Sequence, residues 1–126
     1  MSAINQSIYQ RLLEEGFNLG NLTVVEELVS SNYINHSDNV RGIKQYKHFI
    51  RKFRSAISNL KVVIVNQTSK GDQIVTRWKA IGTHQCELMG IPPSGKKISI
   101  SMNYTATITD GQVAEEWCNS FSLGMI

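Results

Sequence analysis

An imidazole can gain and lose a proton near neutral pH, so the three histidines are the first candidates for proton-transfer chemistry. His36 is the strongest catalytic candidate because it follows the extended segment 33–35, where a helical layer should meet the open mouth of a sheet. A histidine bonded to loop backbone explains it equally well. His84 is either at a pocket rim or on an exposed loop, with the exposed position slightly favoured. His48 is expected on a solvated helix face.

The adjacent carboxyl groups of Glu115 and Glu116 are a second possible source of proton transfer. An apolar wall raises the pKa of a carboxyl group toward neutrality, which suits it to acid/base work. Successive side chains of a regular strand point to opposite faces, so only one of the two can face inward. A solvated, salt-bridging pair is the favoured interpretation.

The two cysteines, Cys86 and Cys118, are too few for a disulfide framework, and neither has metal-ligand spacing to another cysteine or histidine. Reduced, buried thiols are the simplest interpretation. His36, His84 and Glu116 lack a spacing that would indicate a zinc site. We therefore expect no metal site.

The elements that must position these groups follow from hydrophobic periodicity. Apolar residues at helical spacing predict helices over residues 5–19, 22–29 and 43–57. Strands are predicted over residues 60–67, 73–85, 98–108 and 112–120, with a hairpin turn at Asp110-Gly111. This order predicts an α+β fold in which a curved antiparallel sheet packs on three N-terminal helices and encloses a pocket. With 126 residues, 41% of them hydrophobic, and no linker, the chain is expected to form one domain over residues 1–126.

Alternation along the last two strands sorts side chains by face. Met102 and Tyr104 are expected to face the helices, together with Trp117, Asn119 and Phe121. Apolar walls with a few polar groups are typical of small-molecule pockets, although a plain hydrophobic core explains each residue as well. The predicted substrate-binding residues are Tyr33, Phe53, Trp78, His84, Met102, Tyr104, Trp117, Asn119 and Phe121.

The net charge of +3 and a basic cluster within residues 44–54 give only a weak indication of nucleic-acid binding. Amphipathic helices often carry such a cluster as a solvated face, so we do not expect a nucleic-acid partner. No run of about 18 apolar residues indicates a membrane span. The first residues lack the pattern of a signal peptide, and a cytoplasmic location is expected.

Several short motifs spread along nearly the whole chain carry a family resemblance. The loop Met89-Gly90-Ile91-Pro92-Pro93-Ser94-Gly95-Lys96 is the most specific of them. The others are Asn18 to Asn21, Tyr33-Ile34-Asn35-His36, Gly42, Gly82-Thr83-His84, Asp110-Gly111-Gln112-Val113, Glu115-Glu116-Trp117 and Leu123-Gly124-Met125. Together these motifs resemble the SnoaL-like family of polyketide and ester cyclases, within the cone-shaped superfamily of nuclear transport factor and steroid isomerase.

The resemblance implies intramolecular aldol ring closure without a cofactor, and a homodimer through the outer sheet face that carries Ser101 and Thr105. It also implies a pocket aspartate four residues after Trp117, but that position holds Phe121, which cannot transfer a proton. Two interpretations follow. The chain is a cyclase or isomerase of a small carbonyl compound with His36 moving the proton, or it is a non-catalytic module for small-molecule binding or assembly.

Overall fold

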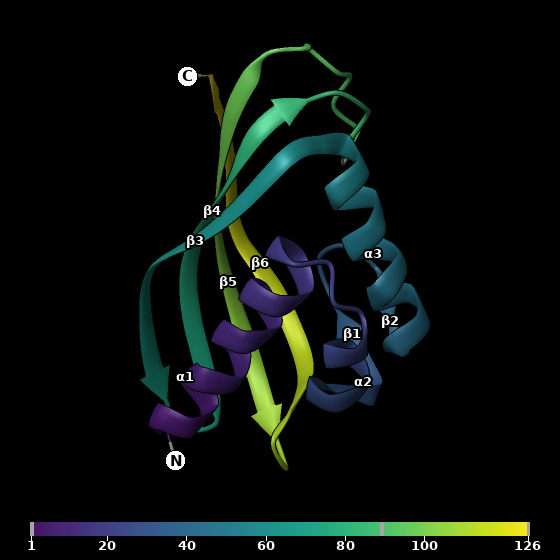
Figure 1. Cartoon of the computed structure of the whole chain (residues 1–126). Coiled ribbons are helices and arrows are strands. Elements are labelled where there is room, and N and C mark those ends of the chain that lie inside the picture. The colour runs from purple at the N-terminus through teal and green to yellow at the C-terminus, as the bar shows by residue number, and fades with distance from the viewer. Residues whose placement is uncertain (1, 89, 126) are drawn as a thin grey trace.

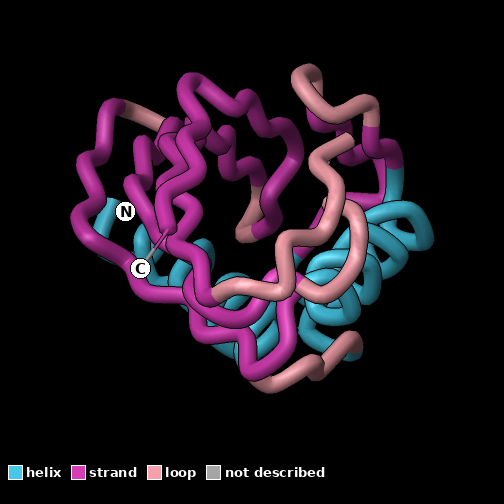
Figure 2. Tube along the Cα trace, turned by 90° about the horizontal axis from the view of Figure 1, so that it is seen from above, coloured by secondary structure: helices cyan, strands magenta, loops and turns pink. Residues whose placement is uncertain are grey.

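The computed structural model describes residues 2–88 and 90–125, so Met89 of the Gly-Ile-Pro-Pro loop lies outside the described residues. The helices gather on the concave side of a strongly curved sheet, which confirms the predicted α+β class (Figure 1). Seen from above, the sheet bends around but does not close on itself (Figure 2). Within the described ranges, no helix has the length and apolar content needed to span a membrane.

The helical layer consists of α1 (Ser2–Arg11), the π-helical segment η1 (Leu12–Asn18), α2 (Thr23–Leu28) and α3 (Gly42–Ala56). The predicted helix 5–19 is therefore one continuous helical stretch whose second half is widened to π-helical geometry. The apolar spacing predicts a buried stripe that includes Ile4 and Ile8. In the structure Tyr9 is buried instead, whereas Ile8 is half-buried and Ile4 is exposed. In η1, Leu13 and Phe17 complete the surface that faces the sheet.

In the described part of the chain, six strands form one sheet in the order β2-β1-β6-β5-β4-β3. They are β1 (Val29–Asn35), β2 (Val40–Arg41), β3 (Ile57–Lys70), β4 (Gln73–His84), β5 (Lys97–Thr109) and β6 (Gln112–Met125). The predicted antiparallel meander is confirmed for β3 to β6. However, β1 pairs with β6 in parallel, which makes the sheet mixed. Parallel pairing needs a long connection, and residues 36–111 lie between these two strands.

The inner face of β5 follows the predicted alternation, since every second residue from Ile98 to Ile108 is buried. Aromatic rings fill the space between this face and the helices. The ring of Phe17 lies 5.6 Å from those of both Phe53 and Trp78. Edge-on and tilted aromatic contacts of this kind stabilise a core by about 0.5–1.5 kcal/mol per pair beyond area burial.

Strand β6 departs from regular alternation at two bulges. Thr107 pairs with Glu115 and Ile108 with Val113, so Ala114 is an extra residue. Such a bulge reverses the face on which every later side chain lies. Glu116 therefore faces the helices, and the predicted inward direction of Trp117 is wrong. A second bulge, at Asn119, restores the original alternation for Phe121.

Candidate functional site

Glu116 is a buried carboxyl group on the concave face, and only 3% of its surface is exposed. The hydroxyl of Tyr33 donates a hydrogen bond to Glu116 Oε1 at 2.6 Å, and the hydroxyl of Tyr9 donates to Oε2. The three residues come from β1, α1 and β6, which are distant in sequence. Folding therefore assembles a carboxyl group that is held by two phenols.

The pKa of Glu116 is raised to about 7, mainly because burial penalises the charged form. The hydrogen bonds from Tyr33 and Tyr9 lower this pKa, and the charge of nearby Asp38 is a smaller effect that raises it. Burial and the neighbouring Glu116 raise the pKa of Tyr9 and of Tyr33 well above the usual value for tyrosine, so both phenols stay protonated and act as donors. A carboxyl group with a pKa near neutrality holds and releases protons under physiological conditions.

A small interior cavity of about 10 Å³ lies beside Glu116, which is room for about one water molecule. Trp78 lines this cavity, and its indole Nε1 is buried without a hydrogen-bond partner among the described residues. An unpaired buried N–H group costs about 1–3 kcal/mol, and this one is free to donate a hydrogen bond to a ligand oxygen. The cavity is lined by Tyr9, Leu13, Phe17, Tyr33, Asn35, Tyr46, Phe49, Trp78, Tyr104 and Glu116.

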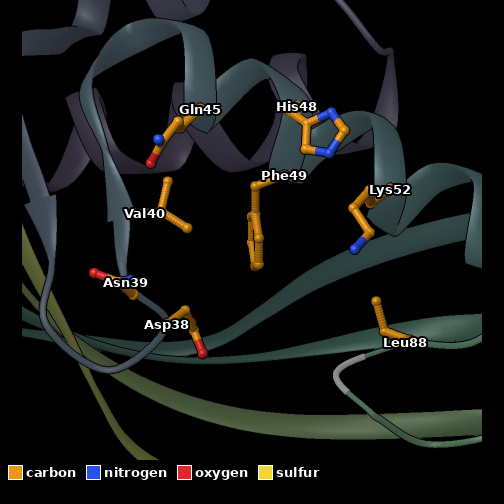
Figure 3. A pocket seen from close by; sticks show the side chains of 8 residues that line it. All are labelled: Asp38, Asn39, Val40, Gln45, His48, Phe49, Lys52 and Leu88. Carbon is orange, nitrogen blue, oxygen red and sulfur yellow. The ribbon is translucent and has the colours of Figure 1, made fainter.

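A larger pocket of about 600 Å³ lies between α3, the segment that follows β1 and the loop that follows β4 (Figure 3). Small-molecule sites typically have volumes of about 300–1,000 Å³. It is lined by Asp38, Asn39, Val40, Gln45, His48, Phe49, Lys52 and Leu88. We call it the mouth pocket. Phe49 lines both the mouth pocket and the interior cavity, so its ring lies between them.

A hydrogen bond also connects the two spaces. The hydroxyl of Tyr104, which lines the interior cavity, donates to Asp38 Oδ2 in the mouth pocket at 2.9 Å. Asn35 Nδ2 donates to the same oxygen at 3.2 Å. Asn35 Oδ1 in turn accepts from the backbone N–H groups of Ser37 and Asp38, both at 2.9 Å, which holds the loop in place. Asp38 is thus positioned at the inner end of the mouth pocket.

His36 lies on the opposite face of β6 from Glu116. Its Nε2 is 2.8 Å from Glu115 Oε2, and its ring stacks on Trp117 at 4.8 Å between centroids. The side chains of His36 and Glu115 are 38% and 42% exposed. His36 therefore does not line the interior cavity. The expected solvated, salt-bridging glutamate is found at Glu115, whereas the same expectation for Glu116 is wrong.

Of the residues predicted to contact a ligand, three line the interior cavity: Tyr33, Trp78 and Tyr104. Phe53 and Met102 are buried in the core outside it. His84 is 2% exposed, so the slightly favoured position on an exposed loop is wrong, and its Nε2 has no partner among the described residues.

The last two predicted residues lie at the second bulge of β6 or beyond it. Asn119 is exposed and donates to Thr105 Oγ1 at 2.8 Å, on the outer face of the sheet. Phe121 pairs with Met102 but is 36% exposed and does not line the interior cavity. The position at which the resemblance implied an aspartate therefore lies outside the space around Glu116.

Sequence reasoning missed Tyr9, Asp38, Phe49 and the inward direction of Glu116. The inward direction depends on the bulge at Ala114, which has no glycine or proline to mark it. Tyr9 lies beside the predicted stripe of helix 5–19 and carries a polar hydroxyl group, so the apolar pattern did not predict that it is buried. The Asn35-x-x-Asp38 spacing was the only usable signal, because asparagine side chains often hold the backbone of a following turn.

A sequence model of the SnoaL-like polyketide cyclase family matches residues 7–120. A search of curated proteins gave no match. TsrD from Streptomyces laurentii is 24% identical, with a TM-score of 0.84 over 98% of this chain and 90% of TsrD. A SnoaL-like polyketide cyclase from Agrobacterium tumefaciens is 15% identical, with a TM-score of 0.82 over 94% of this chain and 91% of its own. At these identities, the likeness shows a shared fold.

A candidate SnoaL-like polyketide cyclase from Jannaschia sp. CCS1 is more similar in sequence. It is 28% identical, with a TM-score of 0.80 over 97% of this chain and 86% of its own. The residues matched by the family model include Tyr9, Tyr33 and Glu116. The chain belongs to the SnoaL-like polyketide cyclase family.

Proposed function

We propose that the chain is a cyclase or isomerase that binds a small carbonyl compound and transfers a proton through Glu116. The observation that carries the proposal is that Glu116, whose pKa is about 7, lines the same cavity as Trp78, whose indole N–H has no partner among the described residues. Carbonyl chemistry needs a base near the carbon acid and a donor near the developing oxyanion. Glu116 and Trp78 supply this pair.

In the proposed reaction, ionised Glu116 removes a proton from the carbon next to the carbonyl group. The electron pair of the broken C–H bond moves onto the carbonyl oxygen, which Trp78 Nε1 stabilises by donating a hydrogen bond. In a cyclase, the enolate carbon then bonds to a second carbonyl carbon of the same molecule. The resulting alkoxide takes its proton from Glu116, which returns the carboxylate. In an isomerase, Glu116 returns the proton to another carbon.

Substrate access requires Phe49 to move, because a cavity of about 10 Å³ is too small for an organic molecule. Phe49 is only half-buried, and its ring faces the mouth pocket (Figure 3). Rotation of this one ring would join the mouth pocket to the cavity beside Glu116. Phe49 is therefore the proposed gate.

The proposed role of Phe49 as a gate can be tested without a substrate. In a Trp117→Phe background, Trp78 is the single tryptophan, and its buried indole should resist quenching by acrylamide. Adding Phe49→Ala should raise the quenching constant at least threefold, because the removed ring opens a path from the mouth pocket. Phe121→Ala is the matched control, because this ring does not line the interior cavity. Equal quenching in both variants would contradict the gate.

A non-catalytic binding module remains the alternative, favoured by Phe121 at the family's acid/base position. In that function, a ligand occupies the same pocket and Glu116 serves as a hydrogen-bonding group. The two functions differ in one measurement, since only the enzyme exchanges the α-protons of a bound ketone with solvent.

We further propose a homodimer through the outer face of the sheet. Val63 and Val65 of β3 are 38% and 49% exposed, and Val65 lines a shallow groove of about 500 Å³ with Arg77 and Lys79. Val65→Arg should weaken dimerisation at least tenfold, since it adds a like charge and removes apolar surface. Sedimentation equilibrium should show a dimer for the wild type and a folded monomer for the variant. A monomeric wild type would reject the dimer.

A further inference from the structure

We propose that the mouth pocket contains an anion-binding subsite at Lys52 and His48, so that the natural ligand is an amphipathic acid. The proposal rests on the mouth pocket as the ligand's entrance and adds the charge of the ligand. Gln45, His48 and Lys52 lie three and four residues apart on α3, so their side chains share one side of the helix. All three line the mouth pocket, together with Phe49 (Figure 3).

The charge of Lys52 is not neutralised by the protein. Within residues 2–88 and 90–125, Lys52 has no carboxylate within ion-pairing distance, whereas its helix neighbour Lys47 has Glu26 at 3.5 Å. Among the residues that the structure describes, Asp38 is the one acidic residue that lines the mouth pocket, and its Oδ2 already accepts hydrogen bonds from Tyr104 and Asn35. The ammonium group is therefore available to a ligand.

The surroundings favour an anion over a neutral molecule. Lys44 is also exposed on α3, four residues before His48, so it adds a positive charge on the same side of the helix. A cleft that is surrounded by one sign of charge concentrates ligands of the opposite sign and speeds their association. The positive charges of Lys52 and Lys44 therefore favour a ligand that carries a carboxylate, sulfonate or phosphate group.

Apolar side chains complete the subsite. Val40, Phe49 and Leu88 provide hydrophobic walls in the same pocket. A ligand that fits this arrangement has an anionic end at Lys52 and an apolar body against Phe49. Its other end, with the carbonyl group, would reach past the gate toward Trp78. The ligand class is thus an aromatic or alicyclic keto acid.

A matched pair of fluorescent probes tests the subsite without knowledge of the substrate. 8-Anilinonaphthalene-1-sulfonate and N-phenyl-1-naphthylamine share one aromatic frame, and only the first is an anion. The wild type should bind the sulfonate at least tenfold more tightly at low ionic strength. Added salt should weaken binding of the sulfonate alone, because screening reduces the attraction between charges.

Lys52→Ala should remove most of this preference, and Lys52→Glu should reverse it, while the affinity for the neutral probe changes less than twofold. Lys70→Ala, at the far end of β3, is the control and should leave both affinities unchanged. Equal binding of both probes to the wild type would overturn the anion subsite and leave the small-molecule pocket intact. Absence of binding of either probe would reject both proposals. A parallel loss of both probes in Lys52→Ala would also overturn the subsite.

Discussion

Glu116→Gln should lower the rate of α-proton exchange by about 10²–10⁴-fold, the usual contribution of a general acid/base group. Glutamine keeps the acceptor oxygen for one tyrosine hydroxyl, so the cavity should retain its shape while it loses the titrating group. The measurement is hydrogen–deuterium exchange at the α-carbon of a panel of cyclic ketones and β-keto acids in D₂O, followed by proton NMR.

The pH dependence of this exchange identifies the group. The active form is the carboxylate, so kcat/KM should rise with pH and level off above about 7, the pKa of Glu116. Tyr33→Phe should move the midpoint to higher pH, because the lost hydrogen bond had lowered that pKa. A change in the midpoint separates a role in proton transfer from a purely structural role.

Glu115→Gln is the matched control for Glu116→Gln. Its carboxyl group is on the next residue, faces the other side of β6 and pairs with His36. The exchange rate should stay within threefold of the wild type. If Glu115→Gln abolished exchange and Glu116→Gln did not, Glu116 would not be the proton-transfer group. His36 and Glu115 would then be assigned that role. Undetectable exchange in the wild type for every ketone would favour the non-catalytic alternative.

The stability of the wild type relative to Glu116→Gln should fall by about 3 kcal/mol between pH 4 and pH 8. The folded-state pKa of Glu116 is about 7, above its ordinary value of 4.5, because burial penalises the charged form. The folded protein thus binds this proton more tightly than the unfolded chain. The resulting stabilisation is fully present below pH 4.5 and is lost as the pH rises through about 7. A shift of this size corresponds to about 1.4 kcal/mol for each pKa unit.

Urea unfolding at pH 4, 6 and 8 measures this difference for both proteins. Glutamine does not titrate, so the variant removes the contribution of Glu116 from the pH profile and leaves all other groups unchanged. Glu115→Gln should keep the wild-type profile. Identical pH profiles for the wild type and Glu116→Gln would mean that the carboxyl group titrates equally in the folded and unfolded states. That result would remove the physical basis of the proposed acid/base role.

Local sequence was sufficient to predict the helices, strands β3 to β6 and the fold class, but it did not predict β1 and β2 as strands. The Asp110-Gly111 turn joins two alternating segments, and the burial of every second residue from Ile98 to Ile108 follows from strand geometry alone. The amphipathic helix α3 was predicted to within one residue at each end, because its apolar stripe repeats over 15 residues. These features depend on neighbours within a few positions in the chain. Family motifs then indicated the cone arrangement.

Tertiary structure alone decided which side chains form the site. A bulge at Ala114 turns Glu116 inward and places Trp117 outside, and the bulge arises from the pairing of β6 with β5 and, in parallel, with β1. The phenols that hold Glu116 lie 107 and 83 residues away in sequence. The pKa of Glu116 follows from burial by these distant segments. Periodicity describes only neighbours along a strand, so it determined the architecture of this protein but not its central carboxyl group.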